Sequence, residues 1–392
     1  MTSFSSQSNR AVRRLTSFVL ILLAIEFLDE LVFGLEQAAW PLIRDELQLT
    51  YTQIGLLFSV PSLIGALAEP FIGVLGDTRW RRVLILGGGL GFALACALTG
   101  FAFRFEILLL GFALFFPSSG AFVSLSQAAL MDTDPQRHEA WMARWTVAGS
   151  LGVVAGPLVL AGLAGLGLGW RVGFLAFAVL AVVLTIFAAR FPFPTASTSE
   201  HISLRGGLRA ALQAVVRPTV LRWLILLEFA DLMLDILLSF LALYVVDVAG
   251  GTVEQGGLAV TVWTGVGLLG DFLLIPLLER VRGLSYLRVS AVVVFCLFLA
   301  FLLAPSFPFK LVMLALMGLF NAGWYAIIQG QLYSALPGQS GTVMAVEALF
   351  GLAVSFIPAL LGWVADEFSL TVTMWLLLLG PVALWVGLPR RT

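Results

Sequence analysis

The amino-acid sequence predicts an all-α membrane protein with twelve transmembrane helices in two six-helix halves. Three observations support this fold class. The chain is 60% hydrophobic and only 11% charged, with a mean hydropathy of +1.01, whereas soluble domains contain about 25% charged residues. It divides into twelve apolar runs, each able to cross a bilayer, for which about 20 residues suffice. A pattern from the first half also returns in the second.

The twelve apolar runs and the segment between the sixth and seventh define the organisation of the chain. The runs are at 16–41, 51–75, 83–102, 107–130, 139–163, 170–192, 219–246, 255–278, 285–304, 309–335, 341–363 and 369–388. Pro, Ser and Thr break the chain after the sixth run, and leucines opposite arginines then predict a short amphipathic helix on the inner leaflet. We therefore expect an N-terminal half at 1–192, a cytoplasmic linker with this helix at 193–217, and a C-terminal half at 218–392.

The internal repeat is carried by the tetrad Glu26-Phe27-Leu28-Asp29, which returns 202 residues later as Glu228-Phe229-Ala230-Asp231. Further positions share the same offset: Gln53 and Gln255, Gly55 and Gly257, Leu56 and Leu258, Gly65 and Gly267, Glu69 and Asp271, Pro135 and Pro337. The chain is therefore a duplicated membrane unit with acidic residues at equivalent positions.

The distribution of basic residues predicts the orientation. Placing both termini on one side of the membrane gathers 18 of the 22 basic residues there, and leaves Arg44, Arg104, Arg171 and Lys310 near the opposite surface. Short cytoplasmic loops carry the excess of Lys and Arg. We therefore expect an integral multi-pass protein of the cytoplasmic membrane with both termini and the linker in the cytoplasm.

Acidic side chains inside the apolar runs are the first candidates for function. A carboxylate at the centre of a membrane helix costs about 2.5–3.5 kcal/mol, and lipid cannot satisfy it, so it must face protein or water. Spacings of three, four and seven place these acids on one stripe of each helix. The candidates are Glu26, Asp29 and Glu30, followed by Glu36, in the first run, and Glu228, Asp231 and Asp235 in the seventh.

Proton coupling is the role expected for these acids, with Asp29 and Asp231 as the leading carriers and Glu26 and Glu228 next. Removal from water favours the protonated form of a carboxyl group, and the sequence places no basic residue at the centre of the membrane. The alternative is that the acids are structural groups that hydrogen-bond their helices to neighbouring ones.

The end of the second run resembles the loop signature of the major facilitator superfamily, because Gly73, Asp77, Arg81 and Arg82 match its glycine, aspartate and paired basic residues. The resemblance implies two halves related by a pseudo-twofold axis and an inner gate in which Asp77 contacts the start of helix 11. Glycine permits close helix approach, and a helix N-terminus favours an anion. The gating candidates are Glu69, Gly73, Asp77, Arg81, Arg82, Asp271 and Glu347.

The fifth run contains Gly149, Gly152, Gly156 and Pro157, which resemble the helix-5 signature of antiporters in that superfamily. Small residues allow helices to approach closely, and ordinary packing is the alternative interpretation.

Polar and aromatic residues in other runs are candidates to line a substrate path. Trp324 lies about half a bilayer deep, at 1.5 Å per residue from Lys310. It could form an aromatic wall for an apolar or cationic ligand or simply pack, whereas Trp40 and Tyr51 are expected at the outer interface. The lining candidates are Gln37, Ser119, Gln127, Trp263, Asn321, Trp324, Tyr325 and Gln329.

A secondary transporter is the function that these features favour. An enzyme is not expected, because His138 and His201 are far apart in sequence and no catalytic or metal-binding spacing is present. A sensor or scaffold would need larger loops. We expect no cofactor and no metal, no ATP-binding loop and no nucleic acid partner; the expected partners are a small-molecule substrate, protons and membrane lipid, with the chain a monomer.

The direction of transport is indicated by residues 40–77, which resemble drug-efflux members of the fosmidomycin-resistance type through Trp40-Pro41-Leu42-Ile43, Tyr51-Thr52-Gln53-Ile54-Gly55 and Glu69-Pro70. The resemblance implies a proton-coupled exporter of a drug-like neutral or cationic compound. A proton-coupled uptake symporter for a sugar, organic metabolite or amphipathic lipid is the alternative, and the sequence leaves open the substrate, the direction and the coupling ion.

Overall fold

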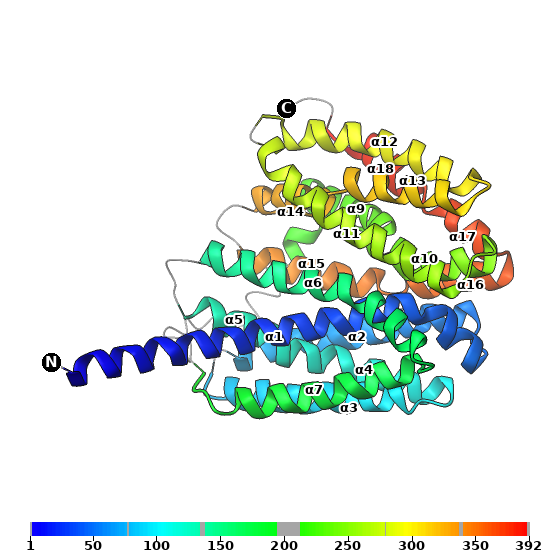
Figure 1. The fold of residues 1–392 in the computed structure, drawn as a ribbon. Helices are drawn as coiled ribbons and strands as arrows, with labels where there is room; N and C mark the ends of the chain where they lie inside the picture. Colours follow the sequence, from blue (N-terminus) through cyan, green and yellow to red (C-terminus); the bar gives the residue numbers. More distant parts are fainter. Residues whose placement is uncertain are drawn as a thin grey trace. The chain divides into compact units, whose positions relative to one another are not determined.

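The structure is a computed structural model that describes residues 2–76, 78–133, 138–193, 212–278, 280–336 and 340–389. These residues form helices and no strand (Figure 1). Eleven of the described segments are long and apolar enough to cross a membrane. The remaining predicted span lies in α1. It is not among the eleven because Glu26, Asp29 and Glu30 add three charged residues to its apolar stretch. The predicted all-α membrane fold is confirmed.

The chain forms two compact units. Unit 1 comprises Met1–Glu36 and Val60–Ser199, and unit 2 comprises Gln37–Ser59 and Glu200–Thr392. The end of the first helix and the start of the second therefore pack with the later part of the chain. Most of the predicted linker helix lies outside the described residues.

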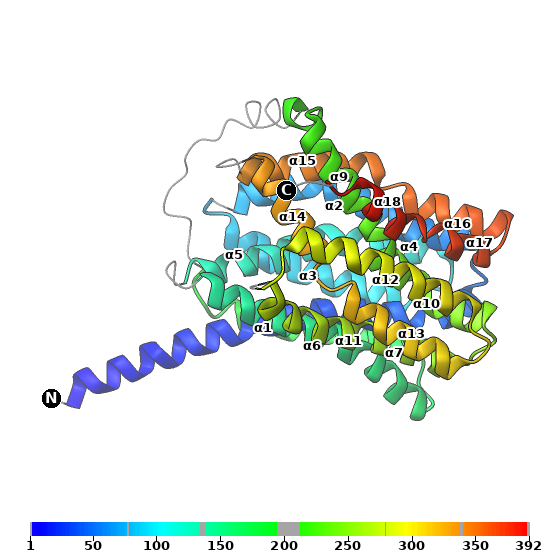
Figure 2. The same ribbon diagram turned by 90° about the horizontal axis from the view of Figure 1, so that it is seen from above.

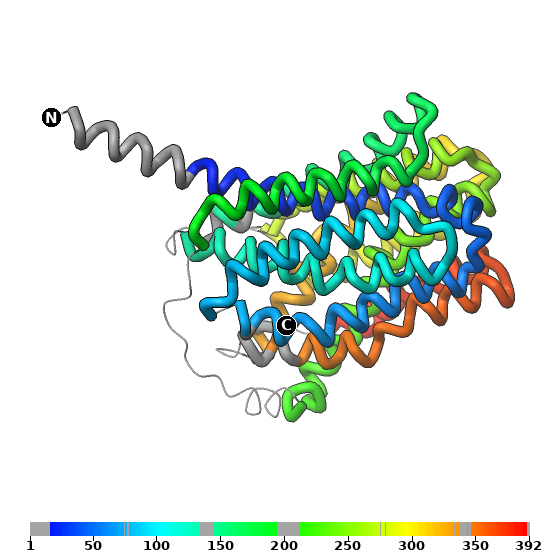
Figure 3. The backbone as a smooth tube through the Cα atoms, turned by 90° about the horizontal axis from the view of Figure 1, so that it is seen from below, coloured from blue at the N-terminus to red at the C-terminus, as the bar shows by residue number. Residues whose placement is uncertain are grey.

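Unit 1 is a bundle in which α3 lies beside α4 and α7 (Figures 1 and 3). The glycine-rich start of α3 makes this packing close, because a Cβ at Gly88 would meet Ala121 and Phe122, and one at Gly89 would meet Thr185. The helices are α1 (Thr2–Leu47) and α2 (Tyr51–Gly76), each shared with unit 2, then α3 (Arg81–Gly100), α4 (Phe105–Ser119), the π-helical segment η1 (Gly120–Ser124), α5 (Leu125–Met131), α6 (His138–Gly165) and α7 (Trp170–Ala188).

Unit 2 contains spans that are assembled from shorter pieces. Asn321 ends one helix, and Gly323 has a φ of 71°, in the left-handed region that favours glycine. The helices are α9 (Pro218–Asp231), η2 (Leu232–Ile236), α10 (Leu237–Leu243), η3 (Tyr244–Val248), α11 (Val253–Leu278), α12 (Gly283–Leu303), α13 (Phe307–Phe320), α14 (Trp324–Ala335), α15 (Ser340–Val354), α16 (Ile357–Glu367), α17 (Leu370–Leu376) and α18 (Leu379–Gly387). Figure 2 shows α18 between α9 and α12, which it contacts.

The sequence repeat has a local structural counterpart at the starts of α2 and α11. The Gln53 side chain accepts from the Thr50 amide at 3.0 Å, and Thr50 Oγ1 accepts from the Gln53 amide at 3.1 Å. Thr252 and Gln255 make the same pair of bonds at 3.0 and 3.3 Å. Such reciprocal bonds satisfy two free donors at a helix start, so the duplication has preserved a helix cap.

The segment Gln37–Ser59 is held in unit 2 by hydrogen bonds at the ends of its helices. Arg44 Nη1 and the Tyr51 hydroxyl both donate to Asp247 Oδ2, at 2.9 and 2.7 Å. The backbone amides of Tyr51 and Thr52 donate to the Asp366 carboxylate at 2.8 and 2.6 Å. Asp366 therefore caps the positive N-terminal end of α2.

Trp40, predicted at the outer interface, is buried within unit 2. Its side chain has no exposed area and lies edge-on to Phe58, with the ring centroids 4.9 Å apart. The ring therefore packs between α1 and α2, and its depth in the membrane stays a prediction.

Candidate functional site

The acidic stripe of unit 1 lies along α1. Glu26 is buried, and Asp29 and Glu30 are half-buried. Ser119 Oγ, at the end of α4, donates to Asp29 Oδ1 at 2.9 Å. The structure thus brings together two residues that the sequence proposed separately, and the hydroxyl stabilises the charged form of the carboxylate that accepts its hydrogen bond.

The glycines of α6 pack directly on this acidic stretch of α1. A Cβ at Gly149 would lie 2.6 Å from Glu26 Oε1, and a Cβ at Gly152 would lie 2.5 Å from the Phe27 carbonyl oxygen and 2.9 Å from Glu30 Cβ. A Cβ at Gly156 would overlap the backbone of α1 near Leu35. Pro157 follows inside α6. The three glycines therefore allow backbone contact between α6 and α1 and fix the position of the acids.

The acidic residues of unit 2 lie where α9 becomes the π-helical segment η2. Glu228 and Asp231 are half-buried, whereas Asp235 is exposed although it lies near the middle of the span Pro218–Val248. Lipid cannot satisfy a carboxylate at that depth, so Asp235 must face protein or water. π-Helical segments occur frequently at functional sites.

Asp231 and Asp235 are four residues apart where α9 continues into η2, so their carboxyl groups are neighbours on one helix face. Two neighbouring carboxylates repel when both are ionised, which favours a proton on one of them. The pair can therefore hold one proton between two acceptors, which is chemistry suited to proton uptake and release.

Among the described residues, Asp29, Asp231 and Asp235 form no ion pair. Its ion pairs include Arg44 with Asp247 and Arg81 with Asp132, at helix ends. Both acidic sites therefore present negative charge or take up protons. Within these residues no cluster of His, Cys, Asp and Glu has the arrangement of a metal site.

Lys310, expected near a surface, is buried in unit 2. It is 6% exposed, and its Nζ donates to the Phe301 carbonyl at 2.7 Å and to the Tyr244 hydroxyl at 3.3 Å. Its ammonium also lies 5.0 and 5.2 Å from the centroids of the Phe301 and Tyr244 rings. These carbonyl, hydroxyl and ring contacts satisfy its charge locally.

Three of the substrate-lining candidates are buried in unit 2. Trp324 has no exposed area, and its Nε1 donates to Ser290 Oγ at 2.8 Å. Trp263 and Asn321 are each 5% exposed, and Asn321 Nδ2 donates to the Met233 carbonyl at 3.5 Å. These contacts favour packing roles for the three side chains.

Other lining candidates retain unsatisfied or accessible polar groups. Gln37 is buried, and no hydrogen-bond partner is recorded for its Oε1 among the described residues. Gln329 and Glu347 share a hydrogen bond, and each has a further buried oxygen without a recorded partner. Tyr325 is 55% exposed, and Gln127 is half-buried. Gln37, Gln329 and Glu347 therefore each have a buried oxygen that a ligand or water could satisfy.

The arginines of the predicted gating loop fasten that loop within unit 1. Arg81 is buried; its Nε donates to the Gly76 carbonyl at 2.7 Å, and its Nη1 pairs with Asp132 at the end of α5. Arg82 Nη2 donates to the Ala189 carbonyl, at the end of α7, at 2.8 Å. Cations are favourable at helix C-termini, so both arginines stabilise the ends of neighbouring helices.

The other gating candidates have different surroundings. Asp77 lies outside the described residues, and a Cβ at Gly73 would meet no described atom within 4 Å. Glu69 is exposed. Asp271 Oδ1 accepts from the Gly323 amide at 3.1 Å, just before α14.

Comparison with known proteins gives a family match over most of the chain. The profile of the family described as Major Facilitator Superfamily matches residues 22–346. Two multidrug resistance proteins MdtG, from Citrobacter koseri and Salmonella choleraesuis, are 32% and 34% identical over 193 and 194 residues. Each alignment covers 46% of this chain and 46% of the relative, so the chain spans about half the length of the curated relatives it matches.

Solved structures with a similar fold include the nucleoside transporter NupG, with a TM-score of 0.74 and 14% identity over 95% of this chain and 100% of that one. A bacterial homolog to the human lysosomal transporter Spinster, in an inward-facing and occupied conformation, has a TM-score of 0.74 and 15% identity. The match covers 94% of this chain and 96% of that one. At these identities the likeness concerns the fold.

Proposed function

This chain belongs to the Major Facilitator Superfamily, and from that premise we propose that it is a proton-coupled exporter of drug-like neutral or cationic compounds. The likeness to multidrug resistance proteins supports export. A proton-coupled uptake symporter is the second candidate, since the same acidic sites would serve either direction.

The observation that carries this proposal is the pair of acids Asp231 and Asp235, four residues apart in the middle of a membrane span. Two neighbouring carboxylates repel when both are ionised, which favours a proton on one of them. Opening of the pair to water on one side exchanges that proton with the solution. The pair is therefore the proposed proton site.

The acidic stripe of unit 1 is suited to a different task. Asp29 accepts a hydrogen bond from Ser119, which favours its charged form, and Glu26 and Glu30 lie on the same face of α1. Asp29 forms no ion pair among the described residues, so its negative charge would attract a cationic substrate. In this scheme Asp29 contributes to substrate binding, and protonation of the stripe releases the substrate.

The energy of one proton is sufficient for this work. For a neutral substrate, entry of one charge at 100 mV supplies about 2.3 kcal/mol, which sustains a substrate gradient of about fortyfold before any pH difference is added. Exchange of one proton for one singly charged cation moves no net charge, so the pH difference alone drives it.

The proposed location is the cytoplasmic membrane, with both termini and the linker in the cytoplasm. Single cysteines at Ser5, Ser199 and Thr392 test this orientation once Cys96 and Cys296 have been replaced by serine. All three should resist an impermeant thiol reagent in intact cells. Labelling of all three from outside would show that the orientation is the opposite of the proposed one.

Proteoliposomes with an acidic lumen test the transport function, with the cationic dye ethidium as the probe. The parent protein should concentrate dye inside, whereas Asp29→Asn and Asp231→Asn should each abolish this uptake and retain measurable dye binding. Glu106→Gln removes an exposed acid at the start of α4 and should transport normally. Full gradient-driven uptake by the Asp29→Asn, Asp231→Asn double variant would refute the proposed coupling.

A further inference from the structure

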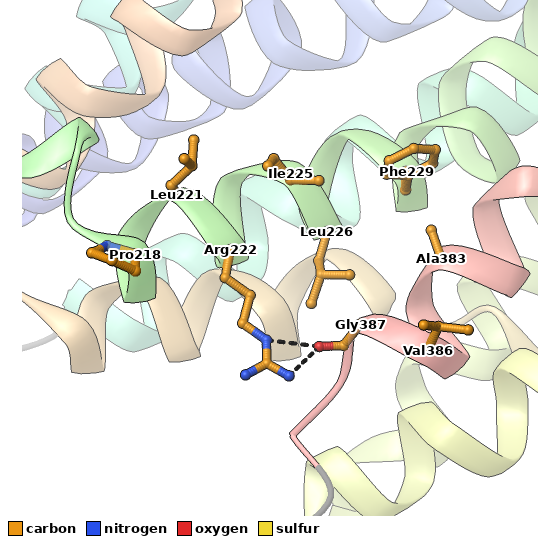
Figure 4. Close-up of a pocket in the computed structure, with 9 residues that line it drawn as sticks. All are labelled: Pro218, Leu221, Arg222, Ile225, Leu226, Phe229, Ala383, Val386 and Gly387. Carbon is orange, nitrogen blue, oxygen red and sulfur yellow. Dashed lines mark hydrogen bonds between the residues drawn. The ribbon is translucent and has the colours of Figure 1, made fainter.

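A groove runs between α9 and α18 on the surface of unit 2 (Figure 4). Its volume is about 590 Å³, and apolar side chains of both helices line it. Leu221, Ile225 and Phe229 come from α9, Ala383 and Val386 from α18, and the buried Leu226 closes its floor. Neither acidic stripe contributes a side chain, so the groove is separate from the proposed transport site.

The sides of this groove are open. Ile225 is 39% and Val386 59% exposed, within two segments that are long and apolar enough to cross a membrane. Exposed apolar side chains on such segments face the hydrocarbon of lipid chains. The groove is therefore accessible from the bilayer.

One end of the groove carries a fixed positive charge. Arg222 donates from Nε to the Gly387 carbonyl at 2.7 Å and from Nη2 to the same oxygen. These bonds hold the guanidinium at the last turn of α18, and Figure 4 shows Nη1 on the side away from Gly387. Two further arginines lie nearby: Arg217 directly precedes α9, and Arg288 donates to the Pro389 carbonyl.

The three arginines have no recorded acidic partner among the described residues. An Arg fork is suited to the oxygens of a phosphate group. Basic sites between transmembrane helices on the cytoplasmic side bind anionic lipid head groups, and the predicted orientation places this end of α9 on that side. The charge therefore favours an anionic ligand at this end.

The length of the groove fits one leaflet of a bilayer. From Pro218 to Phe229, α9 rises about 16 Å at 1.5 Å per residue, which is close to half of the 30 Å or so of bilayer hydrocarbon. A ligand that fills it has an anionic end at Arg222 and an apolar chain reaching Phe229. A phospholipid has this form.

We propose that the groove between α9 and α18 binds an anionic phospholipid, with its phosphate on Arg222 and one acyl chain along Leu221, Ile225 and Phe229. The lipid would hold α9 and α18 together from the membrane side. Because α9 also carries Glu228 and Asp231, the occupied groove would support the helix that bears the proposed proton site. The binding step itself requires no transport activity.

Native mass spectrometry of the full chain, released from detergent with phosphatidylglycerol or phosphatidylcholine, tests this site. The parent should retain phosphatidylglycerol in preference to phosphatidylcholine. Arg222→Gln should bind phosphatidylglycerol about tenfold more weakly, as expected from loss of one charged contact. Ala383→Trp fills the groove and should also reduce binding, with Arg222 intact. Arg280→Gln, which removes an exposed charge from the same unit, is the matched control and should bind as the parent does.

Several outcomes would overturn the site. Equal losses in Arg280→Gln and Arg222→Gln would show that surface charge alone attracts the lipid. Unchanged phosphatidylglycerol binding by Ala383→Trp would show that the acyl chain does not lie in the groove. Thermal stabilisation by inorganic phosphate equal to that by phosphatidylglycerol would show a simple anion site. Cooperative thermal unfolding of each variant confirms that it is folded, and failure of dye binding or transport in the parent would leave the lipid result unaffected.

Discussion

Replacing Gly152 by alanine tests whether contact between α6 and α1 fixes the acidic stripe. The new Cβ would lie 2.5 Å from the Phe27 carbonyl oxygen and 2.9 Å from both Glu30 Cβ and the Leu31 amide nitrogen. Two of these atoms belong to the backbone and cannot rotate away. The helices must therefore separate by about 0.5–1 Å to restore ordinary contact distances, and overpacking of this kind costs about 1–3 kcal/mol.

Gly162 offers a matched control on the same helix, because a Cβ there would meet no described atom within 4 Å. Both substitutions gain about 1 kcal/mol of helix propensity. The difference in stability between the two variants therefore measures the cost of the overlap between the new Cβ and α1. We expect Gly152→Ala to be less stable than Gly162→Ala by about 1–3 kcal/mol, which lowers its Tm by a few degrees. Its gradient-driven dye transport should also fall. Equal Tm values and equal transport would show that the glycine contact does not position the acids.

Three further substitutions test single contacts. Asp366→Asn should speed hydrogen exchange of the first amides of α2 roughly fivefold, from loss of about 1 kcal/mol of capping, whereas Glu367→Gln should leave them unchanged; equal exchange would contradict the cap. Ser119→Ala should lower dye transport several-fold, because a hydrogen bond to the charged Asp29 contributes about 1.5–3 kcal/mol. Transport at the parental rate would show that the Ser119 hydroxyl has no part in the site. Trp324→Phe should lower thermal stability by about 1 kcal/mol with dye affinity unchanged, and weaker affinity at unchanged stability would place this ring in the substrate path.

The features that sequence predicts well are those with a local cause. Apolar runs follow from the absence of water in the bilayer, and the acidic stripe of α1 follows from helical spacing. The glycines of α6 were recognisable because only small residues permit backbone contact between helices. The sequence therefore predicted the spans and the positions of the acids, but it left the two interpretations of those glycines open.

The features that sequence does not predict depend on residues far away along the chain. Hydropathy cannot detect the break at Gly323, since the apolar run continues on both sides of it. Asp132, Asp247 and Asp366 lie in short segments at helix ends, and no spacing links them to Arg81, Arg44 or the start of α2. Each acquires its role from a partner that only the fold brings within reach.

The repeat itself shows where prediction by internal symmetry ends. Asp29 and Asp231 are equivalent by the offset of 202 residues, and so are Ser119 and Asn321. Yet Ser119 donates to Asp29, whereas Asn321 donates to a backbone carbonyl and Asp231 has a second acid, Asp235, four residues further along its helix. The residue equivalent to Asp235 in the first half is Phe33, so no second carboxylate occupies that position. Two substitutions outside the shared tetrad have therefore given equivalent acids different partners, and this difference is the reason for assigning substrate binding to one stripe and the proton to the other.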